Sequence, residues 1–213
     1  KSYFYGFLYI FSLFNKNGRR FHTKLKKEIP NLKIIVGGPG TTPVNDLIYN
    51  LVDYYVQSEG EKAIVDILNG KGNSSPGVNK NDVIQLDNLN ELPWPDYSDF
   101  PLDEYTCKGK LLRVTGSRGC IRRCNFCDIY RLWPVHRKRS GKNIADKIFH
   151  HWKTLPSKPN RFIFTDSLMN GDNKLLRSFC NNIINYQEEN ENFRPTYLGQ
   201  WISATPNWWG EDD

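Results

Sequence analysis

The chain has 213 residues, of which 38% are hydrophobic, and its 29 basic and 23 acidic side chains give a net charge of +6. This length and apolar content can support one large or two small domains. The odd number of cysteines, five, in a mostly polar chain without a clear export signal argues against a disulfide-stapled secreted protein and indicates a reducing, cytoplasmic location.

The first apolar run covers residues 3–14. It is much shorter than the roughly 20 residues that a membrane-spanning helix needs. No small-residue cleavage site follows it, so a buried strand is a better interpretation than the apolar core of a signal peptide. We therefore expect no membrane partner.

Strand and helix patterns then alternate along the first half of the chain. Short apolar runs predict strands at residues 33–36 and 54–56, and apolar residues at helical spacing predict three helices. The apolar positions of these helices are Phe21, Leu25 and Ile29; Leu47, Ile48, Leu51 and Val52; and Ala63, Ile64, Ile67 and Leu68. This alternation predicts a parallel, doubly wound α/β sheet.

Two turns of this half resemble those of the cobalamin-binding, Rossmann-like domain that precedes many radical S-adenosylmethionine (SAM) domains. They are Ile35-Val-Gly-Gly-Pro-Gly-Thr-Thr42 and Tyr55-Val-Gln-Ser-Glu59-Gly-Glu61. The resemblance implies that Gly37, Gly38 and Glu59 contact cobalamin, since glycine lets the backbone approach a bulky ligand. A Gly-Gly pair after a strand is also common in a tight turn that binds nothing.

The cobalt-ligating motif of that domain, Asp-x-His-x-x-Gly, is absent from the sequence. His22 lies in a predicted helix and is a poor substitute, and Ser12-Leu13-Phe14 is only a loose match to the family's Ser-x-Leu partner motif. Cobalamin binding is therefore left open.

A breaker cluster at residues 70–77 separates the two halves. The Pro- and aromatic-rich stretch at residues 92–105 is stiffer, and it resembles the linker between the two modules of cobalamin-associated relatives, although an ordinary packed linker has the same composition. The predicted domains are a Rossmann-like domain at 1–77, a linker at 78–108 and a third segment at 109–213.

Three of the five cysteines fall within eight residues, in Cys120-Ile-Arg-Arg-Cys124-Asn-Phe-Cys127. The apolar run at residues 111–114 predicts a strand that ends just before them, where α/β proteins place cofactors. Three thiolates with an open fourth position suit an iron–sulfur cluster. A structural zinc site would need a fourth ligand, for which Cys107 and His136 are the nearby candidates. A disulfide within the motif is less favoured in a reducing compartment.

The segment Gly119-Cys120-x-x-x-Cys124-x-Phe126-Cys127 after a strand resembles the radical SAM superfamily. The resemblance implies that residues 109–213 are the first part of a radical SAM domain, a partial TIM barrel in which the three thiolates bind a 4Fe–4S cluster and the free iron chelates SAM. Electron transfer then cleaves SAM to methionine and a 5′-deoxyadenosyl radical, and Phe126 lies beside the adenine. Without that resemblance, Phe126 would be interpreted as a loop anchor.

A second buried strand is predicted at residues 161–165 and runs into the polar turn Asp166-Ser167-Leu168. In the radical SAM family this turn carries a Gly-Gly-Glu-like motif that binds the SAM amino group, so the resemblance implies a SAM contact for Asp166 and Ser167. This sequence lacks the two glycines. Asp166 is also a candidate N-cap of the following helix.

Basic residues crowd around the cysteines. They are Arg118, Arg122, Arg123, Arg131, His136, Arg137, Lys138 and Arg139. They suit an anionic cluster, the SAM carboxylate or an acidic electron donor of the flavodoxin or ferredoxin type. They would also suit nucleic-acid phosphates, and Tyr130 and Trp133 could stack on bases, but no nucleic-acid motif accompanies them.

The remaining candidate ligands receive no catalytic role. Cys180 shares the register of a helical apolar face and is predicted to be a buried packing residue. His150 and His151 are predicted to face outward from a helix. A third strand is expected at residues 196–202. Three strands are fewer than the six βα units of a radical SAM partial barrel, so the sequence is interpreted as an internal fragment.

Two functional hypotheses follow. The first is a radical SAM enzyme, with methyl transfer one of the reactions left open and the substrate unknown. The alternative is a zinc- or iron–sulfur-bearing RNA-binding protein without radical chemistry.

Overall fold

The computed structural model describes residues 5–9, 23–38, 46–105, 107 and 110–200. The chain divides into two compact units, Lys1–Leu86 and Asp87–Asp213. The predictions for Ser12-Leu13-Phe14 and for His22 lie outside the described residues. Among the helices in the described ranges, none has the length and apolarity to cross a membrane.

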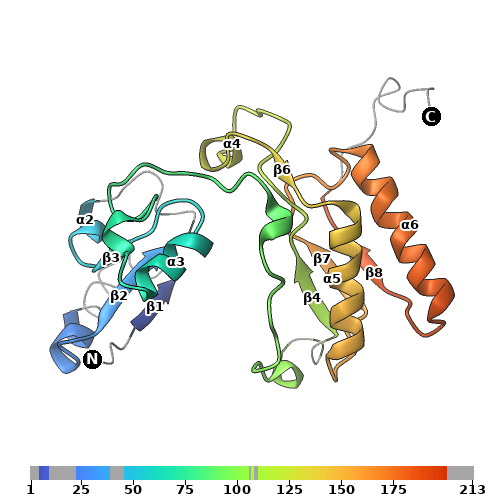
Figure 1. The fold of residues 1–213 in the computed structure, drawn as a ribbon, viewed down its shortest axis with the longest axis horizontal. Helices are drawn as coiled ribbons and strands as arrows, with labels where there is room; N and C mark the ends of the chain where they lie inside the picture. The colour runs from blue at the N-terminus through green and yellow to red at the C-terminus, as the bar shows by residue number, and fades with distance from the viewer. Residues whose placement is uncertain (1–4, 10–22, 39–45, 106, 108–109, 201–213) are drawn as a thin grey trace. The chain divides into compact units, whose positions relative to one another are not determined.

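The first unit contains a parallel sheet of three strands in the order β1-β2-β3 (Figure 1). The strands are β1 (Tyr5–Tyr9), β2 (Lys33–Gly37) and β3 (Tyr54–Tyr55). β1 pairs with β2 from Tyr5↔Lys33 to Tyr9↔Gly37, and Val36 pairs with Tyr55. Each strand coincides with a predicted one.

Helices cover both faces of this sheet because successive β2 side chains point in opposite directions. Ile34 and Val36 pack with Leu25, from the helix at residues 23–28, and with Tyr49 of α2 (Asp46–Tyr49). On the other face, Ile35 packs in a cluster to which α3 (Glu61–Leu68) contributes Ala63 and Ile67. The predicted doubly wound arrangement is therefore confirmed.

The boundary between the units falls inside the segment predicted as a linker. Val78 is fully buried in the core beside α3. The Gln57 amide donates to the Gly77 carbonyl at 2.8 Å, and the Leu86 amide donates to Glu59 Oε2 at 2.8 Å. Residues 78–86 thus complete the first unit, and the chain beyond them packs within the second.

The second unit repeats a strand–helix pattern around another parallel sheet, in the order β4-β7-β8. Its strands are β4 (Leu111–Val114), β7 (Arg161–Phe164) and β8 (Thr196–Leu198). Two long helices connect them, α5 (Gly141–Thr154) and α6 (Asn173–Glu189), and these lie side by side on the sheet (Figure 1). All three predicted strands are present, in the arrangement expected for the first βα units of a barrel.

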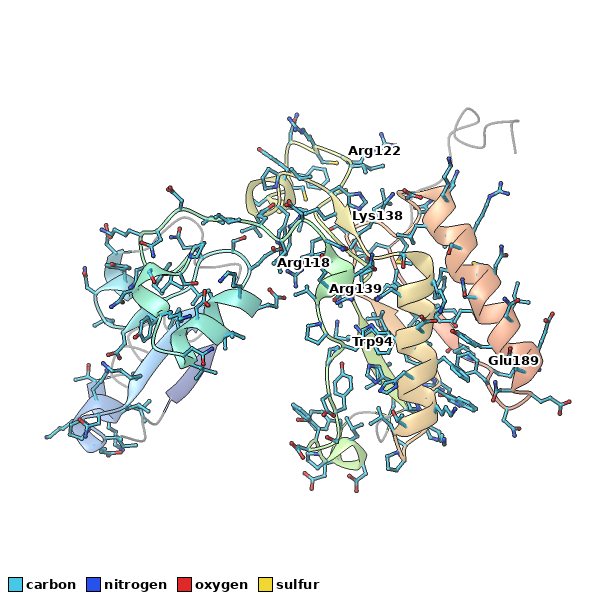
Figure 2. All side chains as sticks on the ribbon, viewed as in Figure 1. Trp94, Arg118, Arg122, Lys138, Arg139 and Glu189 are labelled. Carbon is cyan, nitrogen blue, oxygen red and sulfur yellow. The ribbon has the colours of Figure 1, made fainter. Side chains whose placement is uncertain are left out.

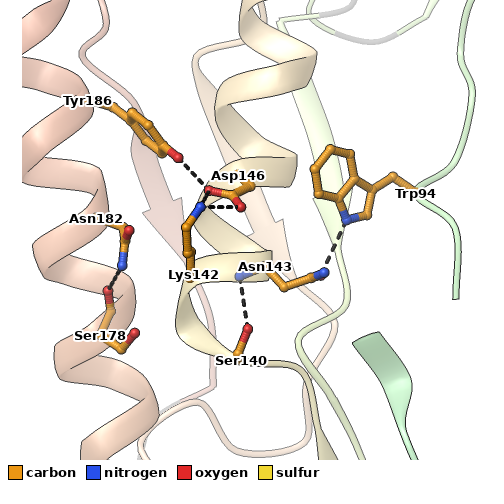
Figure 3. Close-up of polar contacts among 8 residues, drawn as sticks. All are labelled: Trp94, Ser140, Lys142, Asn143, Asp146, Ser178, Asn182 and Tyr186. Carbon is orange, nitrogen blue, oxygen red and sulfur yellow. Dashed lines mark hydrogen bonds and ion pairs between the residues drawn. The ribbon is translucent and has the colours of Figure 1, made fainter. Parts of the chain in front are cut away.

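Side-chain hydrogen bonds cap the N-termini of these two helices and connect one helix to the other. Ser140 caps α5 by accepting from the Asn143 amide, and Asp172 caps α6 by accepting from the Leu175 amide. Asp146 of α5 accepts from Lys142 at 2.7 Å and from the Tyr186 hydroxyl of α6, as Figure 3 shows.

An extended segment, residues 87–105, covers one face of α5. It contains the 3-10 helices η4 (Leu89–Glu91) and η5 (Leu102–Glu104). The Trp94 indole donates to Asn143 Oδ1 at 3.3 Å (Figure 3), and the Tyr97 ring lies 5.1 Å from that of His151.

Two predictions about helix faces are wrong. His151 is buried rather than outward, because the segment at residues 87–105 covers it, whereas its neighbour His150 is exposed as predicted. Cys180 is exposed rather than buried. α6 buries Phe179 and Ile183, and Cys180 is rotated about 100° from Phe179 around the helix, off the buried stripe.

Candidate metal centre beyond strand β4

A two-stranded antiparallel ladder carries the cysteine motif. β5 (Ser117–Arg118) follows β4 and pairs with β6 (Arg137–Lys138). The ladder closes an excursion, residues 119–136, that includes the short helix α4 (Ile129–Leu132). Figure 2 shows Arg122 on this excursion, with Arg118 and Lys138 at its base. The sequence analysis predicted the loop but not the ladder that closes it.

Gly119 lets the two ends of the excursion cross closely. Its φ is +85°, in the left-handed region, and a Cβ built there would lie 2.9 Å from the Val135 carbonyl oxygen and 3.2 Å from His136 Cα. A side chain at this position would meet backbone that cannot move aside. The glycine before the first cysteine is therefore required by the crossing.

The three cysteines of the motif are free thiols that solvent reaches. Cys124 is exposed, and Cys120 and Cys127 are half-buried. The Cys127 amide donates to the Cys124 carbonyl at 3.0 Å, and the Arg122 amide approaches Cys120 Sγ at 3.4 Å. The excursion thus has local turns of its own.

The donor chemistry fits an iron–sulfur cluster, although the thiols are not gathered into a preformed site. Within the described residues, no group of three or more His, Cys, Asp or Glu side chains is arranged to hold a metal ion. Neither Cys107, which is exposed, nor the half-buried His136 completes a four-ligand zinc site in that part of the chain. Three accessible soft ligands on one excursion have the chemistry of a cluster held by three thiolates.

Phe126 lies between the second and third cysteines and is 91% exposed. An anchoring side chain would be packed against its surroundings, so the interpretation of Phe126 as a loop anchor is wrong. The ring is instead available to a ligand.

Asp166 begins the turn after β7 and is buried, with 4% of its surface exposed. Its Oδ1 accepts from the Ser117 hydroxyl at 2.6 Å, and its Oδ2 accepts from the Gly116 amide at 2.9 Å. Burial raises the pKa of the carboxyl, and the hydrogen bonds from Gly116 and Ser117 oppose that rise. Sequence reasoning missed this contact because the partners are 49 and 50 residues apart.

The other predicted residue of this turn, Ser167, is half-buried beside Asp166. The alternative prediction, in which Asp166 caps the following helix, is wrong, since Asp172 is the N-cap of α6. Asp172 also forms an ion pair with Lys138 of β6, which joins the excursion to the start of α6.

The basic residues around the cysteines do not form one exposed surface. Arg122 and Arg123 are exposed, whereas Arg137 and Arg139 are buried. Arg139 donates to the Leu92 carbonyl at 3.1 Å. Half-buried His136 lines a small cavity with Ser117 and Asp166; burial lowers its pKa, and the charge of Lys138 lowers it further. Only part of the basic cluster is therefore presented to an acidic partner.

The candidate cobalamin residues of the first unit lie at the carboxyl ends of two neighbouring strands. Gly37 ends β2, and a Cβ there would lie 3.4 Å from Val56 Cβ, in ordinary contact. Gly38 has a φ of 106°, which favours glycine. Glu59 follows β3 and accepts from the Leu86 amide. At Gly37 and Gly38 this edge has no side chains, which leaves the backbone open to a bulky ligand. Glu59 fixes Leu86, the last residue of the first unit, through its hydrogen bond.

Two curated proteins are similar in sequence, and no family model matches the chain. An uncharacterised methyltransferase of Pyrococcus horikoshii is 32% identical over 124 residues, covering 49% of this chain and 27% of that protein. The anaerobic magnesium-protoporphyrin IX monomethyl ester cyclase of Synechocystis is 26% identical over 179 residues, covering 75% of this chain and 35% of that protein.

A solved structure with a similar fold is that of the radical SAM methyltransferase TsrM from Kitasatospora setae, with cobalamin and a [4Fe–4S] cluster bound. The TM-score is 0.56 at 14% identity, and the match covers 83% of this chain and 38% of that one. The chain thus spans 27% to 38% of the length of these three proteins. Over most of its length the chain shares the α/β fold of that structure, which confirms the predicted fold class.

Proposed function

We propose that this protein is a radical SAM enzyme that binds a 4Fe–4S cluster through Cys120, Cys124 and Cys127. The observation that carries the proposal is the position of three free, accessible thiols on one excursion beyond β4, the first strand of a parallel βα sheet. Ligand sites in such sheets lie at the carboxyl ends of the strands. The sequence similarity to a cyclase and a methyltransferase, and the TsrM-like fold, support it.

A bound cluster with one open iron would supply chelation of SAM and the electron for its reductive cleavage. The chain itself supplies the three thiolates, and the exposed ring of Phe126 offers a flat surface to the adenine. Ser167 and the backbone of the turn after β7 lie at the same sheet edge and would meet the amino acid part of SAM.

The surface beside the thiols suits an acidic redox partner. Arg122 and Arg123 are exposed on the excursion that carries Cys120 and Cys124. Positive charge near a redox centre speeds the encounter with an acidic protein, so the electron donor would be of the flavodoxin or ferredoxin type. Such donors and reduced thiols belong to the cytoplasm.

The first unit would bind cobalamin at the edge formed by Gly37 and Gly38, which offers backbone without side chains to a large planar ligand. Glu59 would shape this edge through its bond to Leu86. Two of the similar proteins are methyltransferases by name, and TsrM has cobalamin bound. Methyl transfer is therefore the reaction favoured here, with the substrate still to be identified.

Electron paramagnetic resonance (EPR) of the anaerobically reconstituted, dithionite-reduced chain tests the cluster. We expect a 4Fe–4S signal that shifts when SAM is added. Serine variants of Cys120, Cys124 and Cys127 should each abolish the signal, because each removes one of three ligands. Cys180→Ser, which removes an exposed thiol on α6, is the matched control and should retain it.

Two results would contradict the proposal. A protein that binds zinc but no iron would support the alternative of a structural metal site. A cluster whose EPR signal does not change when SAM is added would argue against radical chemistry and favour an iron–sulfur protein of another kind.

A further inference from the structure

The base of the cysteine excursion is attached to the end of the second barrel strand by a buried carboxylate. Asp166 Oδ1 accepts a hydrogen bond from the Ser117 hydroxyl, and Asp166 Oδ2 accepts one from the Gly116 amide. These donors lie three and four residues before Cys120. A carboxylate that is 4% exposed has little surface left for the ammonium group of a bound ligand.

The packing around Gly116 is built for this contact. A Cβ on Gly116 would lie 3.1 Å from Asp166 Oδ1 and 2.8 Å from Ile144 Cδ1 of α5. The glycine therefore lets the carboxylate and α5 close over the chain just before β5. A larger residue would push Asp166 away from the excursion.

Neighbouring bonds continue the pairing of β4 and β7 up to this point. The Thr165 amide donates to the Val114 carbonyl at 2.9 Å, and the hydroxyls of Thr115 and Thr165 lie 2.8 Å apart. Asp166 makes the last hydrogen bonds of this series. Because it directly follows the paired part of β7, it holds Ser117, the first residue of β5, at a fixed place relative to β7.

We propose that Asp166 is a positioning residue that fixes the base of the cysteine excursion through Gly116 and Ser117, and that it does not contact SAM directly. The proposal rests on the proposed cluster site and assigns Asp166 a different part in it. Partners that orient metal ligands without touching the metal commonly change metal affinity by about 10- to 100-fold when they are removed.

The test compares Asp166→Ala, Asp166→Asn, Ser117→Ala and the double variant Asp166→Ala/Ser117→Ala in the full chain. The measurements are iron retained under a chelator challenge, the EPR signal without SAM, and the SAM-induced shift. We expect Asp166→Ala to weaken iron retention by about tenfold or more. Ser117→Ala should weaken it less, and the double variant should resemble Asp166→Ala, because the two residues act through one bond.

Asp166→Asn should recover part of the retention, since an amide can accept from Gly116 and donate to the Ser117 hydroxyl. Asp146→Asn is the matched control. It changes a carboxylate of α5 that accepts from two side chains, Lys142 of α5 and Tyr186 of α6, and should leave iron retention unchanged.

Backbone amide exchange provides a readout that needs no cluster. Asp166→Ala should speed exchange at Gly116 and Ser117 in the metal-free protein. If the parent chain takes up no cluster, the proposed function fails, while faster exchange would still support the positioning role and unchanged exchange would overturn it.

A direct SAM ligand gives a different pattern. Asp166→Ala would then keep its iron and lose only the SAM-induced shift, and Ser117→Ala would behave like the parent. That result would overturn the positioning role.

Discussion

At the scale of single residues, Lys147 of α5 carries a basic group on an almost fully buried residue. Its side chain is 3% exposed, and the described residues offer no hydrogen bond to its ammonium group. Burial and, to a smaller extent, the charge of Arg139 lower the pKa of Lys147 to about 8, and the charge of Asp166 opposes the shift. A buried, unpartnered cation costs stability when it is protonated.

We predict that Lys147→Met raises the free energy of unfolding by about 1–3 kcal/mol at pH 7. Below the folded-state pKa, about 8, both the folded and the unfolded chain carry the proton, and the penalty is complete. As pH rises from there to the ordinary lysine value, the penalty disappears, so the gain should shrink. Urea unfolding at several pH values measures it.

Lys153→Met is the control, since Lys153 is exposed on the same helix and should change stability by no more than about 0.5 kcal/mol. Destabilisation by Lys147→Met would mean that the ammonium has a favourable partner in solution.

At the scale of elements, the second unit depends on the close crossing of α5 and α6. Gly141 is the first residue of α5, and a Cβ there would lie 2.4 Å from both the Leu175 carbonyl oxygen and the Phe179 amide nitrogen. Both atoms belong to the α6 backbone. The two helices therefore approach to a distance that only glycine allows.

We predict that Gly141→Ala lowers the free energy of unfolding by about 1–3 kcal/mol, because α6 must shift to admit the methyl group. The sign of this change in stability is informative, because a Gly→Ala substitution inside an uncrowded helix raises the free energy of unfolding by about 0.5–1 kcal/mol. Gly171→Ala is the control, with its nearest atom at an ordinary 3.4 Å. Equal stability of the two variants in denaturant unfolding would contradict the close crossing.

At the scale of the whole molecule, the chain consists of two units with separate cores. The first unit closes its core with a residue from the predicted linker, fully buried Val78, which packs near Ile67 of α3. The core of the second unit lies between its own sheet and helices. Loss of packing in one core should therefore be felt mainly within that unit.

Val78→Ala should destabilise the first unit by about 1–3 kcal/mol through the cavity that it leaves. Hydrogen exchange in the intact chain should rise in α3 and remain unchanged in α5 and α6. Val83→Ala, at a position 41% exposed, is the control. Exchange that rises equally in all three helices would show that the two units unfold as one.

The sequence by itself determined the order of the parallel strands in both units and of the long helices α5 and α6, because apolar spacing reflects which face of each element is buried. It also determined the donor set of the candidate metal centre, since the spacing of Cys120, Cys124 and Cys127 is a local property of the chain. The α/β fold class was predicted from the alternation of strands and helices, and the fold comparison confirmed it.

The tertiary structure alone decided which of these residues meet partners far away in the chain. Asp166 reaches Gly116 because β4 and β7 are neighbours in the sheet, and His151 is buried because the chain after residue 86 crosses α5. Cys180 is exposed because only a narrow stripe of α6 packs inward. Burial and long-range hydrogen bonds depend on how the elements pack together, and the local pattern of apolar and polar residues does not specify that packing.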